Sequence, residues 1–165
     1  VWLARTKINS LYWPEAKAKL KKIRAPKEFL KLGGVFVTLY KRGCLRGCIG
    51  TVHPVCDNIC EEVLRNAVLA AQDDPRFPPV REEELRQLEI SVDVLSAIQP
   101  VDDIRSLDPK RNGLLVTAGN RSGLLLPDLD GIDSVEEQLA ICKEKAGLPD
   151  GTPVKVYSFT VTRYT

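Results

Sequence analysis

The sequence predicts an α+β fold of two similar halves, each a β-hairpin followed by a helix and a strand, with antiparallel sheets packed by helices. Three observations predict it: β-branched runs separated by turn residues, helices with N-capping residues, and the repetition of this order along the chain. Of the 165 residues, 44% are hydrophobic and 28% are charged. This composition is typical of a globular protein.

The N-terminal part of the chain is basic, with nine Lys and Arg against two Glu in residues 1–33. The apolar spacing in Trp2–Tyr12 predicts a short amphipathic helix. The stretch between Pro14 and Pro26 is either a loop or a second short helix. We interpret its lysines as a solvated helix face rather than a nucleic-acid site, because no aromatic residues separate them.

A β-hairpin opens the first half. Val35–Tyr40 is rich in β-branched and aromatic residues, Lys41 to Gly43 form a turn, and Cys44–Thr51 is the return strand. Two glycines in the segment LRGCIG weaken a strand, so they indicate a bulge or the close approach of another backbone or a ligand. We therefore list Gly47 and Gly50 as candidate ligand-binding residues.

A capped helix and a third strand complete the first half. Asn58 followed by Glu61 predicts a helix start, and Asp74 with Pro75 ends the helix. Leu88–Leu95 alternates apolar and polar residues, which predicts a half-buried strand.

The second half repeats this order with a strand, a turn, a return strand, a capped helix and a closing strand. Ser134 caps the helix and Gly147 suits the position after it, where a positive φ is needed. The other elements lie at residues 113–118, 119–123, 124–126 and 153–164. We expect one domain, 1–165, with subdomains at approximately 1–96 and 97–165.

Arg46 and Cys48 are the candidate catalytic residues, because strand alternation puts them on one face. A neighbouring cation favours the thiolate, which is the reactive form of cysteine. The alternative is a small buried thiol beside an arginine that pairs with a carboxylate elsewhere.

The loop Asp74–Pro79 supplies further candidate ligand-binding residues. Its two consecutive prolines predict an extended backbone that displays Arg76 and Phe77. Asp74 and Arg76 either recognise a ligand, or pair with each other and cap the preceding helix.

A metal site is not expected. Four cysteines and the single histidine, His53, are close in sequence, but structural zinc sites use knuckles in loops and the first cysteine pair lies in a strand. We interpret His53 as an exposed loop residue. The four cysteines are Cys44, Cys48, Cys56 and Cys60.

Taken together, LRGCIGT at 45–51, DPRFPPV at 74–80 and LEISVDVLS at 88–96 resemble the AMMECR domain family. The segments GLLLPDLDG at 123–131 and VKVYSFTVTRY at 154–164 are similar to it as well. The resemblance implies an α+β protein of two subdomains. It also implies association with a Memo-like protein and a radical S-adenosylmethionine protein, in the set called AmmeMemoRadiSam, whose system protein A this chain looks like.

The family has no agreed activity, so whether the protein is an enzyme, and with which cofactor, stays open. We expect an accessory component of that modification pathway, with an unknown small ligand bound around the LRGCIG strand. The alternatives are a non-catalytic protein-protein interaction module and an RNA-binding accessory protein that uses residues 15–31. Nucleic acid and membrane are not expected partners.

An odd number of cysteines indicates reduced thiols and a cytoplasmic protein. Because the chain begins at Val1, we expect that it can be the C-terminal part of a longer polypeptide, as in members where a Memo-like domain precedes this one.

Overall fold

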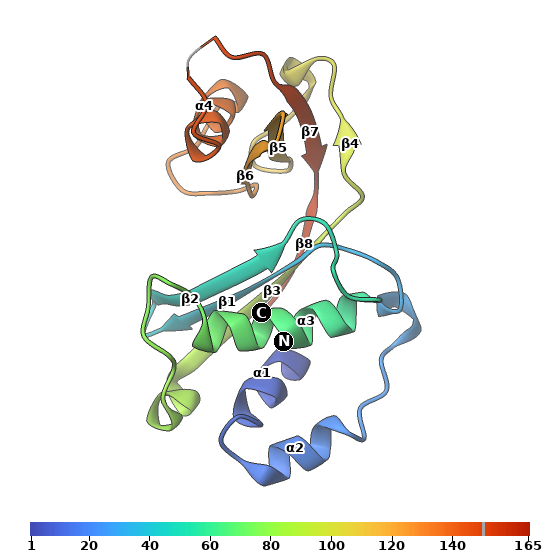
Figure 1. Cartoon of the computed structure of the whole chain (residues 1–165), viewed down its shortest axis with the longest axis vertical. Coiled ribbons are helices and arrows are strands. Elements are labelled where there is room, and N and C mark those ends of the chain that lie inside the picture. The colour runs from blue at the N-terminus through green and yellow to red at the C-terminus, as the bar shows by residue number, and fades with distance from the viewer. Residues whose placement is uncertain (150) are drawn as a thin grey trace. The chain divides into compact units, whose positions relative to one another are not determined.

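The computed structural model describes residues 1–149 and 151–165, which form two compact units (Figure 1). The first unit comprises Val1–Val94 and Thr162–Thr165, and the second comprises Leu95–Val161. Each unit contains one four-stranded sheet, in the orders β2-β1-β3-β8 and β4-β7-β5-β6. The predicted α+β class, with two antiparallel sheets packed by helices, is confirmed.

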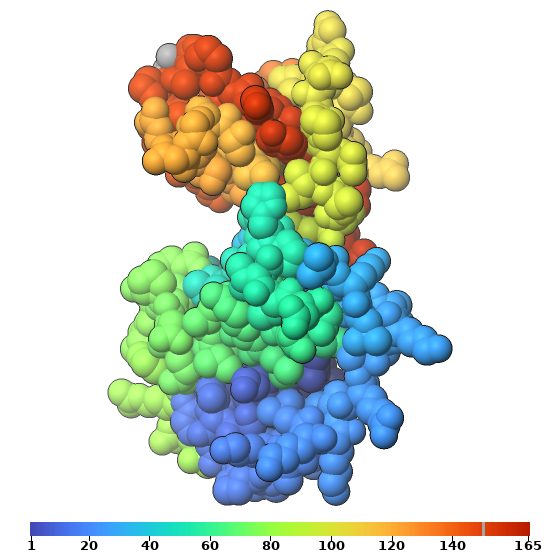
Figure 2. Space-filling model, turned by 45° about the vertical axis from the view of Figure 1, so that its right-hand side comes forward, coloured from blue at the N-terminus to red at the C-terminus, as the bar shows by residue number. Residues whose placement is uncertain are grey.

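The N-terminal segment is helical. Helix α1 (Trp2–Asn9) packs on helix α3 (Ile59–Gln72), and the short helix α2 (Pro14–Leu20) follows α1. Pro14 stands in the first turn of α2, where its missing N–H has no acceptor in any case. In Figure 2 the N-terminal segment (dark blue) and α3 (green) share one face of the first unit. A 3₁₀ turn, Lys27–Phe29, precedes the sheet.

Helix α3 begins as the sequence predicts. The side-chain oxygen of Asn58 accepts the backbone N–H of Glu61 at 3.1 Å. The apolar face of α3 packs on strands β1 and β2. The alanines of that face allow the helix axis to approach the sheet closely; they are Ala67, Ala70 and Ala71.

The first sheet is built on the predicted hairpin of β1 (Val35–Lys41) and β2 (Cys44–Thr51). Arg42 and Gly43 both have positive φ, 53° and 76°, as the right-handed twist of a tight hairpin requires. A register shift leaves Arg46 without a partner in β1, because Leu39 pairs with Gly47 and the next residue of β1 pairs with Leu45. Arg46 is therefore the extra residue of a β-bulge.

Strand β3 (Leu88–Leu95) has the predicted bounds but is not half-buried. Ser91 and Asp93, which alternation assigns to a solvated face, are both buried. The reason is that β3 lies between β1 and β8 (Val161–Tyr164), and Arg163 of β8 covers Asp93 with two bonds of 2.8 and 2.9 Å. A 3₁₀ segment, Glu82–Gln87, leads into β3.

The second unit contains β5 (Gly113–Ala118), β6 (Arg121–Leu125) and helix α4 (Val135–Lys145). The turn is shorter than predicted, because the return strand begins at Arg121 rather than Leu124. As predicted, Ser134 caps α4 by accepting the N–H of Glu137, and Gly147 has a φ of 62°. The sheet is completed by β7 (Lys155–Phe159) and β4 (Gln99–Pro100), and a 3₁₀ turn lies at Ile104–Ser106.

The predicted closing strand, residues 153–164, was wrong as a single element. It divides at Thr160 into β7, which pairs with β5, and β8, which joins the first sheet. The structure thus returns residues 162–165 to the first unit, whereas the sequence analysis assigns them to the second subdomain. A strand also follows β3, but this strand, β4, lies within the second unit and joins the sheet of that unit.

Candidate functional site at the edge of strand β2

Strand β2 is an edge strand, and the side chains of Asp74 and Arg76 satisfy its outer backbone groups at Cys48. The N–H of Cys48 donates to Oδ2 of Asp74 at 2.8 Å. The carbonyl of Cys48 accepts Nη2 of Arg76 at 3.0 Å. The two side chains take the place of a neighbouring strand, which protects an otherwise open edge. We call Cys48, Asp74 and Arg76 the edge clamp.

Asp74 and Arg76 also hold each other. Arg76 donates Nε to Oδ1 of Asp74 at 3.0 Å and Nη2 to Oδ2 at 2.8 Å, which is a bidentate ion pair. The backbone N–H of Arg76 donates to the same carboxylate at 3.0 Å. The pairing that the sequence analysis offered as an alternative is present, and the pair caps a strand edge rather than the preceding helix.

The electrostatics of the pair follow from its unequal burial. The side chain of Asp74 is 2% exposed and that of Arg76 is 54% exposed. The guanidinium of Arg76 holds the pKa of Asp74 well below its usual range, although burial alone acts in the opposite direction. The same bond raises the pKa of Arg76. Asp74 is therefore an anion at any physiological pH and keeps the clamp closed.

The Cys48 thiol lies beside this clamp. Its sulfur is 3.2 Å from Oγ1 of Thr38 on β1, and the residue is half-buried. The guanidinium of Arg76 lies against the same residue, because its Nη2 donates to the Cys48 carbonyl at 3.0 Å. The cation next to Cys48 is consequently Arg76.

Arg46 contacts a different partner, Glu84. It donates Nε to Oε1 at 3.0 Å and Nη2 to Oε2 at 2.9 Å, and Lys41 donates to Oε1 at 2.8 Å. The bond from Arg46 lowers the pKa of Glu84 to about 2, against the effect of burial. The Arg46 and Glu84 side chains are 12% and 14% exposed. The structure thus realises the alternative in which Arg46 pairs with a distant carboxylate, because the β-bulge redirects its side chain.

The two candidate glycines are approached by protein atoms. A Cβ on Gly47 would lie 2.2 Å from the carbonyl oxygen of Ala70 in α3. A Cβ on Gly50 would lie 2.2 Å from the ring of Phe36. The sequence left open a bulge or a close approach by a backbone or a ligand. The bulge is present at Arg46, next to Gly47, a backbone oxygen approaches Gly47, and a side-chain ring approaches Gly50.

Phe77 lies at the open side of the clamp. The guanidinium carbon of Arg76 is 5.5 Å from the centre of its ring, a cation–π geometry. Phe77 is half-buried and Arg76 is exposed, so the loop presents a flat cation stacked on an aromatic ring. The predicted extended backbone was wrong for the start of this loop, because Asp74–Phe77 form a turn in which the N–H of Phe77 donates to the carbonyl of Asp74 at 3.1 Å.

The remaining cysteines lie in different environments. Cys44 is exposed, Cys142 is buried, and burial raises the pKa of Cys142 to about 11. Burial also raises the pKa of Cys56 and of Cys60. His53 is exposed. Within residues 1–149 and 151–165, no three metal-ligating side chains are grouped to hold a metal ion. No helix in that part of the chain is long and apolar enough to cross a bilayer.

Two residues of the site, Thr38 and Glu84, were not predicted from the sequence. Thr38 is the cross-strand partner of Cys48. Pairing the residues of the two predicted strands one by one, outward from the turn, places Thr38 close to Cys48. Glu84 belongs to a run of three glutamates, and nothing in the run distinguishes the one that reaches Arg46.

Comparison with known proteins shows to which family the chain belongs. The family model for AMMECR1 matches residues 1–165. The chain belongs to the AMMECR1 family. A relative from Thermotoga maritima is 53% identical over 138 residues, which cover 82% of this chain and 79% of that protein. One from Clostridium acetobutylicum is 51% identical over 132 residues, which cover 79% of this chain but only 28% of that protein.

A solved structure is also similar to this chain. The crystal structure of the uncharacterized protein PH0010 from Pyrococcus horikoshii matches with a TM-score of 0.80 and 36% identity. The match covers 98% of this chain and 88% of that chain. The likeness therefore extends over both units.

Proposed function

We propose that this AMMECR1-family protein is an accessory component of a modification pathway that includes a Memo-like protein and a radical S-adenosylmethionine protein. In this proposal it binds a small ligand at the edge clamp. The observation that carries the proposal is the position of the half-buried Cys48 thiol beside an immobilised, half-exposed Arg76 guanidinium.

The clamp favours a ligand with a carboxylate or phosphate group. Nε and Nη2 of Arg76 are fully used by Asp74 and Cys48, whereas Nη1 has no hydrogen-bond partner among the residues described. A guanidinium that is already oriented loses little conformational entropy on binding an anion. Cys48 is then the contact residue or nucleophile next to the bound group, with Arg76 in the role that the sequence analysis gave to Arg46.

Competing alkylating reagents test this arrangement. We expect anionic iodoacetate to label Cys48 faster than neutral iodoacetamide does, relative to the same ratio at exposed Cys44, because Arg76 attracts the carboxylate. Arg76→Gln should abolish this preference, and Arg46→Gln, the matched control, should retain it. Mass spectrometry of the native protein reads each cysteine separately. The proposed anion site is wrong if Arg76→Gln leaves the ratio unchanged.

The role in the pathway needs a separate test. We expect Cys48→Ser to lower pathway output in a complementation assay at unchanged protein level. Unchanged output with Cys48→Ser would remove Cys48 from the proposal.

A non-catalytic interaction module is the second candidate, and the stacked pair of Arg76 and Phe77 favours it. Such a pair is typical of the centre of a protein interface, where aromatic residues and arginine are enriched. This candidate predicts that co-purification with the Memo-like or the radical S-adenosylmethionine protein is lost in Phe77→Ala and kept in Cys48→Ser. If Cys48→Ser instead loses pathway output in the complementation assay and still co-purifies with these proteins, the first candidate is favoured.

A further inference from the structure

The first unit contains a pocket that shares no residue with the edge clamp. This pocket has a volume of about 830 Å³ and is lined by α1, the segment 20–30, the start of α3, β3 and Tyr164. We call it the N-terminal pocket. Its size falls in the range of small-molecule sites, which is roughly 300–1,000 Å³.

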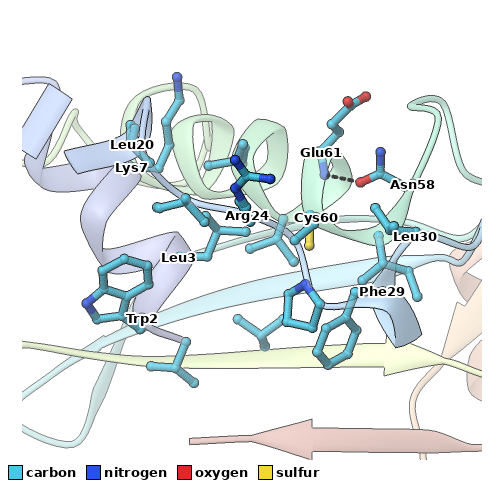
Figure 3. A pocket seen from close by; sticks show the side chains of 18 of the residues that line it. Trp2, Leu3, Lys7, Leu20, Arg24, Phe29, Leu30, Asn58, Cys60 and Glu61 are labelled. Atoms are coloured by element: carbon cyan, nitrogen blue, oxygen red, sulfur yellow. Dashed lines mark hydrogen bonds between the residues drawn. The ribbon is translucent and has the colours of Figure 1, made fainter. Parts of the chain in front are cut away.

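The interior of the N-terminal pocket is apolar. Leu3, Phe29 and Val92 contribute to its wall, and Figure 3 shows Leu3 and Phe29 among the residues around the opening. Two other lining residues are large and exposed, since Trp2 is 61% and Leu30 is 55% exposed. Leaving this apolar surface in water is unfavourable, so a hydrocarbon group that fills the pocket gains free energy by covering it.

The charged residues of the lining are mainly positive. Lys7, Lys21 and Arg24 line the pocket, and none of them pairs with another residue in the described part of the chain. Glu61 is the acidic residue of the lining. In Figure 3 Lys7 and Arg24 lie to the left of Cys60 and Glu61 to its right, so the opposite charges occupy different parts of the opening. An anionic group beside Lys7 and Arg24 thus meets unpaired cations.

We propose that the N-terminal pocket binds a single-chain amphipathic anion, with its hydrocarbon chain in the pocket and its carboxylate or phosphate against Lys7, Lys21 and Arg24. This combination uses both properties of the site, the apolar wall and the unpaired cations. RNA would meet the cations but leave the apolar wall in water, because its polar backbone does not fill such a pocket. The basic segment, which the sequence analysis interpreted as a solvated face, here supplies the head-group contacts.

Tryptophan fluorescence gives a direct binding measurement. The chain has two tryptophans, and Trp13 lies outside the lining, so a Trp13→Phe background reports on Trp2 alone. We expect dodecyl phosphate, at concentrations at which it is monomeric, to change this signal saturably. Dodecanol should bind at least about tenfold more weakly, because it lacks the charge that Lys and Arg recognise.

A charge-reversal pair with a matched control locates the head group. The variant Lys21→Glu/Arg24→Glu should weaken dodecyl phosphate binding at least about tenfold. The control Lys17→Glu/Lys19→Glu makes the same change of charge on exposed residues of α2 that do not line the pocket, and should bind as the parent does. Equal weakening in both variants would overturn the assignment, because it would indicate attraction by net charge alone.

Cys60 provides a readout that does not depend on fluorescence. Its sulfur points into the pocket, so bound dodecyl phosphate should slow its alkylation, and should do so equally in Arg76→Gln, which lacks the anion-binding cation of the edge clamp (Figure 3). This result is independent of the edge clamp, so the two proposals can fail separately. Dodecanol binding as tightly as dodecyl phosphate, saturation only with anionic phospholipid vesicles, or protection of Cys60 by single-stranded RNA instead would each overturn the proposal.

Discussion

The carboxylate of Asp74 accepts the backbone N–H of Cys48 at 2.8 Å and so closes the edge of strand β2 without another strand. The same carboxylate holds Arg76, whose guanidinium binds the Cys48 carbonyl at 3.0 Å. One buried anion therefore fixes a strand edge, a cation and the position of a thiol. Stability and the proposed ligand site consequently depend on the same side chain.

Replacing Asp74 by Asn should destabilise the protein by about 2 kcal/mol, because hydrogen bonds to a buried charged group are lost and Arg76 loses its partner. The measurement is the free energy of unfolding in urea. Asp73→Asn is the control, since Asp73 is exposed and adjacent. Equal stabilities of the two variants would contradict the clamp.

Glu84→Gln should also cost about 2 kcal/mol, because it leaves the largely buried charge of Arg46 unpaired. The neighbouring Glu83 is exposed and makes no side-chain ion pair among the described residues, so Glu83→Gln should change stability by less than about 0.5 kcal/mol. Thermal denaturation of the pair of variants checks this. If Glu83→Gln is as costly as Glu84→Gln, the pairing with Arg46 contributes nothing.

The pH dependence of stability should carry the signature of Glu84. Its pKa is lowered from an ordinary 4.5 to about 2 in the folded protein, so between these values the unfolded state binds more protons. The stabilisation is present above pH 4.5 and is lost as the pH falls toward 2. Wild type should therefore lose more stability than Glu84→Gln between pH 5 and pH 2.5, measured by urea unfolding at each pH. Parallel losses would show that Glu84 titrates normally.

Gly47→Ala should destabilise by more than about 2 kcal/mol, because the new methyl group meets a backbone oxygen of α3 that is 2.2 Å away and fixed by its helix. Gly43→Ala is an instructive control. No atom lies within 4 Å of its Cβ position, so only its positive φ is costly, by about 1 kcal/mol. Thermal unfolding of both variants, followed by circular dichroism, measures the two losses of stability. A smaller loss for Gly47→Ala than for Gly43→Ala would contradict the close packing of α3 on β2.

Local sequence signals predicted most elements of the fold. The bounds of Cys44–Thr51, Leu88–Leu95 and Gly113–Ala118 agree with the structure, because turn residues and alternation define them within a few positions. The division of the last strand at Thr160 was not predictable in this way. Threonine favours strands, and only pairing with two different sheets reveals the interruption.

Most residues of the site were predicted from the sequence, but the contacts between them were not. Both Cys48 and the loop with Asp74 and Arg76 were predicted from the sequence, but the predicted neighbour of Cys48 was Arg46. The alternation rule that placed them on one face fails at a β-bulge, and the glycines of LRGCIG indicated a bulge as one of two possibilities without giving its position. The N-terminal pocket was missed for a related reason, since its wall combines segments distant in sequence.

Strand β8 also constrains the order in which the protein can fold during synthesis. The first unit needs residues 162–165 as the outer strand of its sheet, and these are translated only after the whole of the second unit. Until they leave the ribosome, β3 has an open edge and Asp93 lacks the guanidinium of Arg163. The first unit therefore completes its sheet only after the second unit has been translated, and a nascent chain that lacks residues 162–165 exposes a strand edge able to pair with other chains.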